Sequence, residues 1–132
     1  MTPTTENSGL LSARHRDWIE RATALVDQIA GWAEALGWKV NREEKTISEK
    51  WGSYPIPALH IHPPQGELLV NPIALQVAGG NGRIDLEAVP TLSRVKFLGT
   101  EDGWRIMTDS NVPLRIPWNR ESFIQLANDL LA

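Results

Sequence analysis

Cysteine is absent from the 132-residue chain. Its absence excludes disulfide bonds, thiolate metal sites, cysteine nucleophiles and thiol redox switching. Histidine is scarce, with only three residues, so few side chains can carry acid–base chemistry near neutral pH or bind a metal through imidazole. A chain without cysteine suits the cytosol, and a cytoplasmic location is expected.

Long hydrophobic runs are also missing. No apolar stretch approaches the roughly 18 residues that a membrane span needs. The N-terminal MTPTTENSG has neither the basic nor the apolar region of a secretory signal. We therefore expect a soluble intracellular protein that has no membrane partner and whose residues 1–11 are disordered.

Charge of one sign is not concentrated anywhere. The chain holds 13 basic and 16 acidic residues, with a net charge of -3, so it has no basic field to attract phosphates, and nucleic acid is not expected as a partner. At this length, 42% hydrophobic and 22% charged residues are typical of one domain with one core. We expect residues 12–132 to form that domain.

The motifs of common enzymes are missing too. The sequence has no phosphate-binding loop and no dinucleotide-binding GxGxxG, and its serines lack a nucleophile elbow. The GGNG at 79–82 lies between two alternating segments, where a hairpin turn accounts for the glycines. The sequence therefore predicts no catalytic residues.

Two helices are predicted at the two ends of the domain. The first runs from Ala13 to Leu36, with Ser12 as N-cap and Gly37 as left-handed C-cap. Its apolar stripe recurs at spacings of four and three residues: Trp18, Ala22, Leu25, Ile29, Trp32 and Leu36. The second begins after an N-cap at Asn119, where Trp118 and Phe123 have the spacing of a hydrophobic staple. Its apolar face comprises Phe123, Leu126, Ala127 and Leu130.

Between the helices, alternating apolar and polar residues predict an antiparallel meander of five or six strands. The turns are expected at residues 63–66, around GGNG, at PTLS (90–93) and at TEDG (100–103). Apolar and charge matching predicts the pairs Leu86 with Phe97, Ala88 with Val95, Glu87 with Lys96, Phe97 with Ile106, and Arg94 with Asp109. Prolines 55, 57 and 72 place the hairpin that contains them near a sheet edge. The expected fold is α+β, with both helices on one apolar face and a charged face left open.

The stretch HIHPPQGE, residues 60–67, is the first candidate site. If residues 63–66 form the turn, His60, His62 and Glu67 share one face of a hairpin. Two imidazoles and a carboxylate can bind a divalent metal such as zinc, iron or manganese. The stretch resembles the first half of the cupin metal motif, but no histidine follows His62 and a long helix replaces part of a jelly roll. The alternative is a solvated hairpin with a weak contact between His62 and Glu67.

A charged strand face is the second candidate, comprising Arg83, Asp85, Glu87, Arg94 and Lys96. The segments GRIDL (82–86) and EALGWKVNREE (34–44) resemble the strand with the first aspartate, and the entry into the sheet, of the PD-(D/E)XK nucleases. The resemblance implies two-metal hydrolysis, but Arg94 stands where the second acid is needed, so it implies an inactive member. The alternatives are a solvated face of cross-strand pairs or a surface that binds a partner.

These observations leave three functional hypotheses. The first is a non-enzymatic interaction or accessory module that binds a protein partner through the open face or the edge hairpin. The second is a metal-binding protein or metal-dependent enzyme that uses His60, His62 and Glu67. The third is a degenerate nuclease-like domain, for which a mixed sheet with a crossover is the distinguishing feature. Trp51, Tyr54 and Trp104 are candidates for a ligand groove or a contact patch, or belong to the core.

Overall fold

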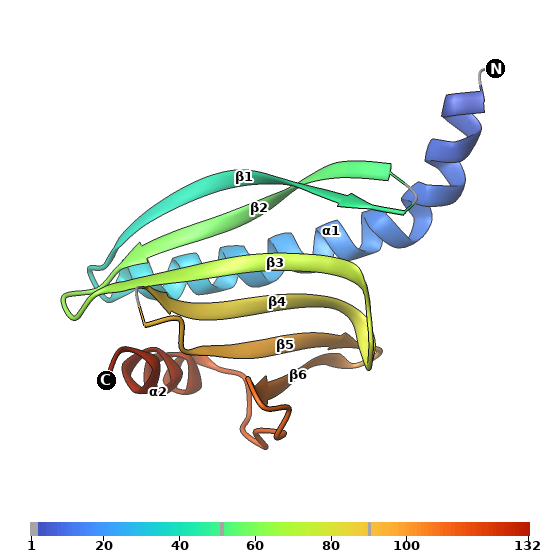
Figure 1. Ribbon diagram of the computed structural model, residues 1–132. Helices are drawn as coiled ribbons and strands as arrows, with labels where there is room; N and C mark the ends of the chain where they lie inside the picture. Colours follow the sequence, from blue (N-terminus) through green and yellow to red (C-terminus); the bar gives the residue numbers. More distant parts are fainter. Residues whose placement is uncertain (1–2, 51, 90) are drawn as a thin grey trace.

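A computed structural model describes residues 3–50, 52–89 and 91–132, with side chains described from residue 13 onward. The chain folds as α+β: a long N-terminal helix, a six-stranded sheet and a short C-terminal helix (Figure 1). The elements are α1 (Pro3–Ala35), β1 (Lys39–Glu49), β2 (Gly52–His62), β3 (Glu67–Val77), β4 (Gly80–Val89), β5 (Arg94–Thr100), β6 (Gly103–Thr108) and α2 (Arg120–Leu131).

Helix α1 carries the predicted apolar stripe, and Trp18, Leu25 and Ile29 are almost fully buried. It ends at Ala35, and Gly37 takes the left-handed conformation predicted for the C-cap, with φ of 80°. The predicted start at Ala13 was too late, because α1 begins at Pro3 and takes in most of the segment expected to be disordered. Proline is tolerated in the first turn of a helix. The division of the chain at residue 12 stays a prediction.

The six strands form one antiparallel sheet in the order β1-β2-β3-β4-β5-β6. The meander prediction is confirmed. The nuclease resemblance implies a mixed sheet with a crossover, and no crossover occurs in this sheet. GRIDL therefore lies on the fourth strand of a meander, and the likeness of that segment does not extend to the fold.

The β1–β2 hairpin separates from the rest of the sheet along much of its length. β1 and β2 pair continuously from Lys39 to Glu49, but β2 pairs with β3 only over Leu59–Ile61. In Figure 1 this hairpin rises away from β3 toward the N-terminal half of α1. Pro55 and Pro57, which cannot donate to a ladder, lie in the separated part of β2.

Two hairpin registers agree with prediction and one differs. His60 lies opposite Leu69, and Phe97 lies opposite Ile106. Between β4 and β5, Leu86 lies opposite Val95 instead of Phe97, so the register is shifted by two residues. Ala88 N–H donates to Ser93 C=O, so the four-residue loop is 89–92 and begins one residue before the predicted 90–93. Pro90 in this loop lies outside the described residues.

The loop 89–92 explains why the sequence did not reveal this register. It ends at Leu92, which has a φ of 63°. Glycine or asparagine is expected where the backbone is left-handed, and leucine gives no such signal. The shift of two residues keeps every side chain on its predicted face but changes which charges lie opposite one another.

Both helices pack on the same face of the sheet, as predicted. Trp118, just before α2, lies edge-on to Phe97 of β5, with ring centroids 4.9 Å apart. It also lies edge-on to Trp32 of α1 at 5.3 Å and donates a hydrogen bond to Gln28 at 2.7 Å. Asn119 caps α2 by accepting a hydrogen bond from Ser122 N–H, as predicted. The aromatic cluster therefore joins α1, α2 and the sheet in one core.

Candidate functional site

The histidine hairpin has the predicted register, but each histidine faces a different partner. His62 Nδ1 lies 3.3 Å from Glu67 Oε1, and His62 Nε2 lies 3.2 Å from Asn41 Nδ2. His60 Nδ1 lies 3.4 Å from Glu43 Oε1 on β1. The two imidazole rings are nearly perpendicular, with centroids 6.4 Å apart. These are cross-strand pairs on a partly exposed surface.

A metal ligand set does not emerge from this arrangement. In the part of the chain that the structure describes, no group of three or more His, Asp or Glu side chains is placed to hold a metal ion. His60, His62 and Glu67 share a face but do not converge on one point. The structure therefore gives no support to a metal site here.

The charged face of the sheet is occupied by a network centred on Asp85, whose side chain is fully buried. Arg83 binds both Asp85 oxygens, with Nε and Nη2 each at 2.8 Å. Arg94 approaches Asp85 at 3.6 Å and Asp109 at 3.7 Å. The hydrogen bonds that Arg83 donates to Asp85 raise the pKa of Arg83. The predicted contact between Arg94 and Asp109 is present.

The network continues toward β1 through Glu87, which is only 8% exposed. Lys45 of β1 donates to Asn71 Oδ1 and to Pro72 C=O, both at 2.6 Å. Burial lowers the pKa of Lys45, and the nearby carboxylates of Glu87 and Asp85 partly oppose that effect. The charges on this face thus bind one another.

Lys96 does not pair with Glu87 as predicted, because the register shift places it opposite Asp85. Its ammonium donates instead to Asn111 at 3.0 Å. Arg83, Asp85, Glu87, Arg94 and Lys96 are therefore brought together on one face, as expected. However, Asp85 and Glu87 are buried beneath their partners and are not presented to a second molecule.

A different surface has backbone groups without partners: the outer edge of β6. Thr108 N–H donates to Val112 C=O at 2.9 Å, and Leu114 N–H donates to Ile106 C=O at 2.8 Å. Every second residue of an antiparallel strand directs its N–H and C=O to the same side. The Trp104 N–H and C=O and the Ile106 N–H therefore point outward too. Among the described residues, none of these three groups has a hydrogen-bond partner.

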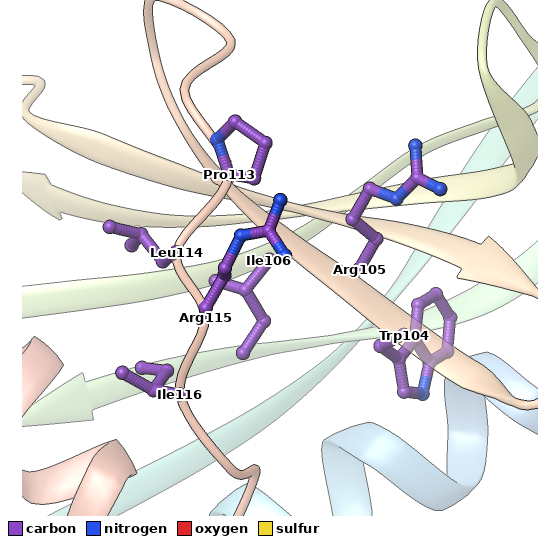
Figure 2. A pocket seen from close by; sticks show the side chains of 7 residues that line it. All are labelled: Trp104, Arg105, Ile106, Pro113, Leu114, Arg115 and Ile116. Atoms are coloured by element: carbon purple, nitrogen blue, oxygen red, sulfur yellow. The ribbon is translucent and has the colours of Figure 1, made fainter.

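Beside this free edge lies a groove of about 420 Å³. Its two sides are β6 residues 104–106 and the segment 113–116, which diverges from β6 after a single bridge between Met107 and Pro113. Ile106 is buried and Leu114 packs against the core, so the base of the groove is apolar. Figure 2 shows β6, the facing segment and the side chains of the seven residues that line the groove.

Trp104 forms a fixed wall at one end of the groove. The Arg21 guanidinium of α1 lies 5.0 Å from the centroid of its indole. Trp18 packs edge-on to the same indole at 6.4 Å. Arg21 also donates to Thr100 C=O at 2.8 Å and Gly103 C=O at 2.6 Å, which anchors the β5–β6 hairpin to α1. The wall is therefore held in place before any ligand binds.

Two arginines flank the groove, Arg105 on β6 and Arg115 on the facing segment (Figure 2). Both side chains are exposed. Neither takes part in an ion pair or side-chain hydrogen bond within the described chain. Among the described residues, no acidic side chain lines the groove. The groove thus combines unpaired strand groups, an apolar base and two guanidinium groups.

A second groove, of about 430 Å³, lies between α1 and the ends of β3, β4 and β5. Its arginines are already bound to the protein itself. Arg14 donates to Asn81 Oδ1 at 3.1 Å, and Arg21 binds backbone carbonyls. Asp17 and Glu101 add negative charge to its lining. It therefore has fewer free binding groups than the groove beside β6.

Sequence reasoning found only part of the β6 groove. It named Trp104 as a candidate for a groove or patch, and Trp104 does line the groove. Tyr54 instead lies in the core, 7% exposed, and Trp51 lies outside the described residues. Arg105 and Arg115 were missed. No local signal marks them, because the groove forms between residues ten positions apart that meet only when segment 113–116 passes β6.

Comparison with known proteins identifies no relative. The chain matches no protein-family model, no curated protein and no solved structure. Within the described residues, neither helix is long and apolar enough to cross a membrane.

Proposed function

We propose that the domain is a cytoplasmic, non-enzymatic interaction module that binds an extended segment of a protein partner along the free edge of β6. The observation that carries the proposal is the set of outward backbone groups without a described partner, the Trp104 N–H and C=O and the Ile106 N–H, beside a groove with an apolar base. An extended peptide adds to such an edge through its own N–H and C=O groups. Alternate side chains of the peptide then enter the groove.

The chain itself provides a precedent for this pairing. Its own segment around Pro113 already forms one bridge to β6 and then leaves the edge. A bound peptide would pair with the Ile106 N–H and with the Trp104 N–H and C=O, which the chain's own segment leaves unpaired within the described residues. Free strand edges attract other strands, and proteins usually block or cover those that have no role. Here the uncovered edge adjoins a groove of the size typical of ligand sites.

Backbone amide NMR tests the proposal, with a probe peptide of eight residues that alternates glutamine and valine. Binding should shift the amide signals of residues 104–106 and 114–116 and leave those of β1, the opposite edge strand, unchanged. A peptide with the same sequence but N-methylated at alternate residues should not bind, because it cannot donate to the strand edge. Shifts confined to β1, or equal binding of the N-methylated peptide, would contradict the proposal.

Two substitutions on the segment after β6 provide a matched comparison. Ile116 is 39% exposed and lines the groove, whereas Val112 is 56% exposed and does not line it. Ile116→Ser should weaken peptide binding about threefold to tenfold, the usual effect of removing one apolar contact of this size. Val112→Ser should leave the affinity within experimental error. Equal effects of the two substitutions would show that the peptide binds elsewhere.

A further inference from the structure

The two arginines beside the groove have no ion-pair or hydrogen-bond partner in the described structure, and the same holds for the exposed Arg120 at the start of α2. The other arginines whose contacts are known use their guanidinium groups internally: Arg21 on carbonyls, Arg42 on Asp27, and Arg83 and Arg94 on Asp85. Arg105 and Arg115 have no such contact. Their charge is therefore available to a second molecule.

The position of these charges relative to the free strand edge is defined by the fold. Ile106 lies opposite Phe97 and faces the helices, so Arg105 points to the other face of the sheet. Arg115 lies across the groove on the facing segment (Figure 2). A strand added between them would have one guanidinium group on each flank. Alternate side chains of that strand would lie on the same face of the sheet as Arg105.

We infer that the segment bound at the β6 edge is acidic, with Asp or Glu side chains alternating with apolar ones. This inference depends on the proposed function. The planar guanidinium group can bind both oxygens of a carboxylate, which favours arginine for this kind of recognition. The apolar side chains of the same peptide would contact Ile106, Leu114 and Ile116 at the base and rim of the groove.

The charge distribution favours an acidic peptide over a nucleic acid. The chain has a net charge of -3, so a polyanion would be repelled by most of the surface. Two guanidinium groups can neutralise few phosphates, and nucleic-acid affinity depends on many such contacts. A strand with two or three carboxylates matches the local positive charge and also uses the backbone groups of Trp104 and Ile106.

The test compares three eight-residue peptides that alternate valine with glutamate, glutamine or lysine. Dissociation constants are measured by amide NMR titration at low and high salt. The glutamate peptide should bind about tenfold more tightly than the glutamine peptide at 50 mM salt, because two charge pairs of ordinary strength contribute. This advantage should shrink at 500 mM salt, where charges are screened. The lysine peptide should bind most weakly.

Two protein variants locate the effect. In Arg105→Gln/Arg115→Gln, the advantage of the glutamate peptide over the glutamine peptide should disappear. The control is Lys39→Gln, at the exposed start of β1 on the opposite edge of the sheet, which should retain the full advantage. Both arginines are exposed and have no partner among the described residues, so these substitutions should not affect folding.

The possible results separate the two proposals. If the glutamine and glutamate peptides bind equally well at residues 104–106, the inferred acidity is wrong and the strand-binding function stands. If no peptide shifts these residues, both proposals fail. Retention of the glutamate advantage in the double arginine variant overturns the inference. So does displacement of the glutamate peptide by a single-stranded oligonucleotide or a phosphoserine peptide that binds more tightly.

Discussion

The carboxylate of Glu49, at the end of β1, lies where the β1–β2 hairpin separates from β3. Its side chain is 8% exposed. Oε1 accepts hydrogen bonds from Leu75 N–H at 3.1 Å and Gln76 N–H at 3.0 Å, and Oε2 accepts one from the Tyr54 hydroxyl. Trp18 Nε1 donates to the same hydroxyl at 3.0 Å. One side chain therefore satisfies β3 backbone groups that a neighbouring strand would otherwise pair.

Opposing effects determine the pKa of Glu49. Burial by itself raises it, but hydrogen bonds from Tyr54, Gln76 and Leu75, with a smaller contribution from His15 3.6 Å away, together lower it below its ordinary value of 4.5. The pKa of Tyr54 is raised, first by burial and then by its hydrogen bond to the carboxylate. The ionised form of Glu49 is therefore stabilised by folding.

Because the pKa of Glu49 is lower in the folded than in the unfolded protein, its stabilisation is complete above pH 4.5 and is lost as the pH falls through the folded pKa. We expect Glu49→Gln to lower the free energy of unfolding by about 2 kcal/mol at pH 7. The difference from wild type should shrink below pH 4.5. Urea denaturation between pH 3 and pH 8 measures both quantities.

The control for this prediction is Glu44→Gln, an exposed position on the same strand that has no ion pair among the described residues. Its free energy of unfolding should change by less than about 0.5 kcal/mol at any pH. A stability of Glu49→Gln equal to that of wild type at pH 7 would show that the carboxylate does not support β3.

At the scale of elements, α1 and β4 approach each other closely at Gly82. A Cβ added there would lie 2.3 Å from Trp18 Cε3, so the indole occupies the space that a side chain would need. Gly82 also has a φ of 96°, which L residues rarely adopt. The glycine therefore allows the long helix to pack directly on the strand.

We expect Gly82→Ala to destabilise the protein by about 3 kcal/mol, because overpacking and backbone strain add. Gly37→Ala is the comparison: Gly37 has a φ of 80°, but a Cβ there meets nothing within 4 Å. That substitution should cost only about 1 kcal/mol from strain alone. Chemical denaturation of the two variants measures the difference. Equal losses would mean that the contact with Trp18 has no energetic effect.

Polar side chains and an irregular segment take the place of strand pairing at two positions in the sheet. Within the sheet, β2 pairs with β3 only over Leu59–Ile61, and toward the start of β2 the side chains of Lys45 and Glu49 on β1 hydrogen-bond to the β3 backbone instead. At the β6 edge, segment 112–114 covers only part of the strand. Some β3 groups are thus satisfied by side chains of the protein itself, whereas the Ile106 N–H and the Trp104 N–H and C=O have no partner among the described residues.

At the scale of the whole molecule, helices from opposite ends of the chain share one core. Phe123 of α2 is fully buried. The centroid of its ring lies 5.9 Å from that of Trp32 on α1 and 6.1 Å from that of Trp38, just before β1. The contacts join residues about ninety positions apart. The protein should therefore unfold as one cooperative unit.

Phe123→Ala should lower the free energy of unfolding by about 3–5 kcal/mol, the range for removing a buried aromatic side chain. The loss should affect the whole protein and not α2 alone. Far-UV circular dichroism and tryptophan fluorescence should therefore report the same denaturation midpoint in the variant. Two separate transitions would show that α2 folds independently of the sheet.

The sequence by itself determined the elements, the meander order and the face of most side chains. These properties depend on residues close along the chain: the stripe from Trp18 to Leu36, the cap at Asn119, and turns marked by Gly66 and Gly103. The β5–β6 register followed as well, because a glycine marks its turn. The β4–β5 register did not, because its turn closes on Leu92, which carries no turn signal.

Only the tertiary structure decided which polar groups are used internally and which remain free. The sequence showed Asp85 and Glu87 as charged residues on an open face, but the neighbouring strands bury both. The contacts of Glu49 with the Leu75 and Gln76 N–H groups likewise depend on where β3 lies. The groove at β6 exists because a segment with no regular structure passes that strand and then diverges. Such contacts depend on distances between residues far apart in sequence, which no local pattern encodes.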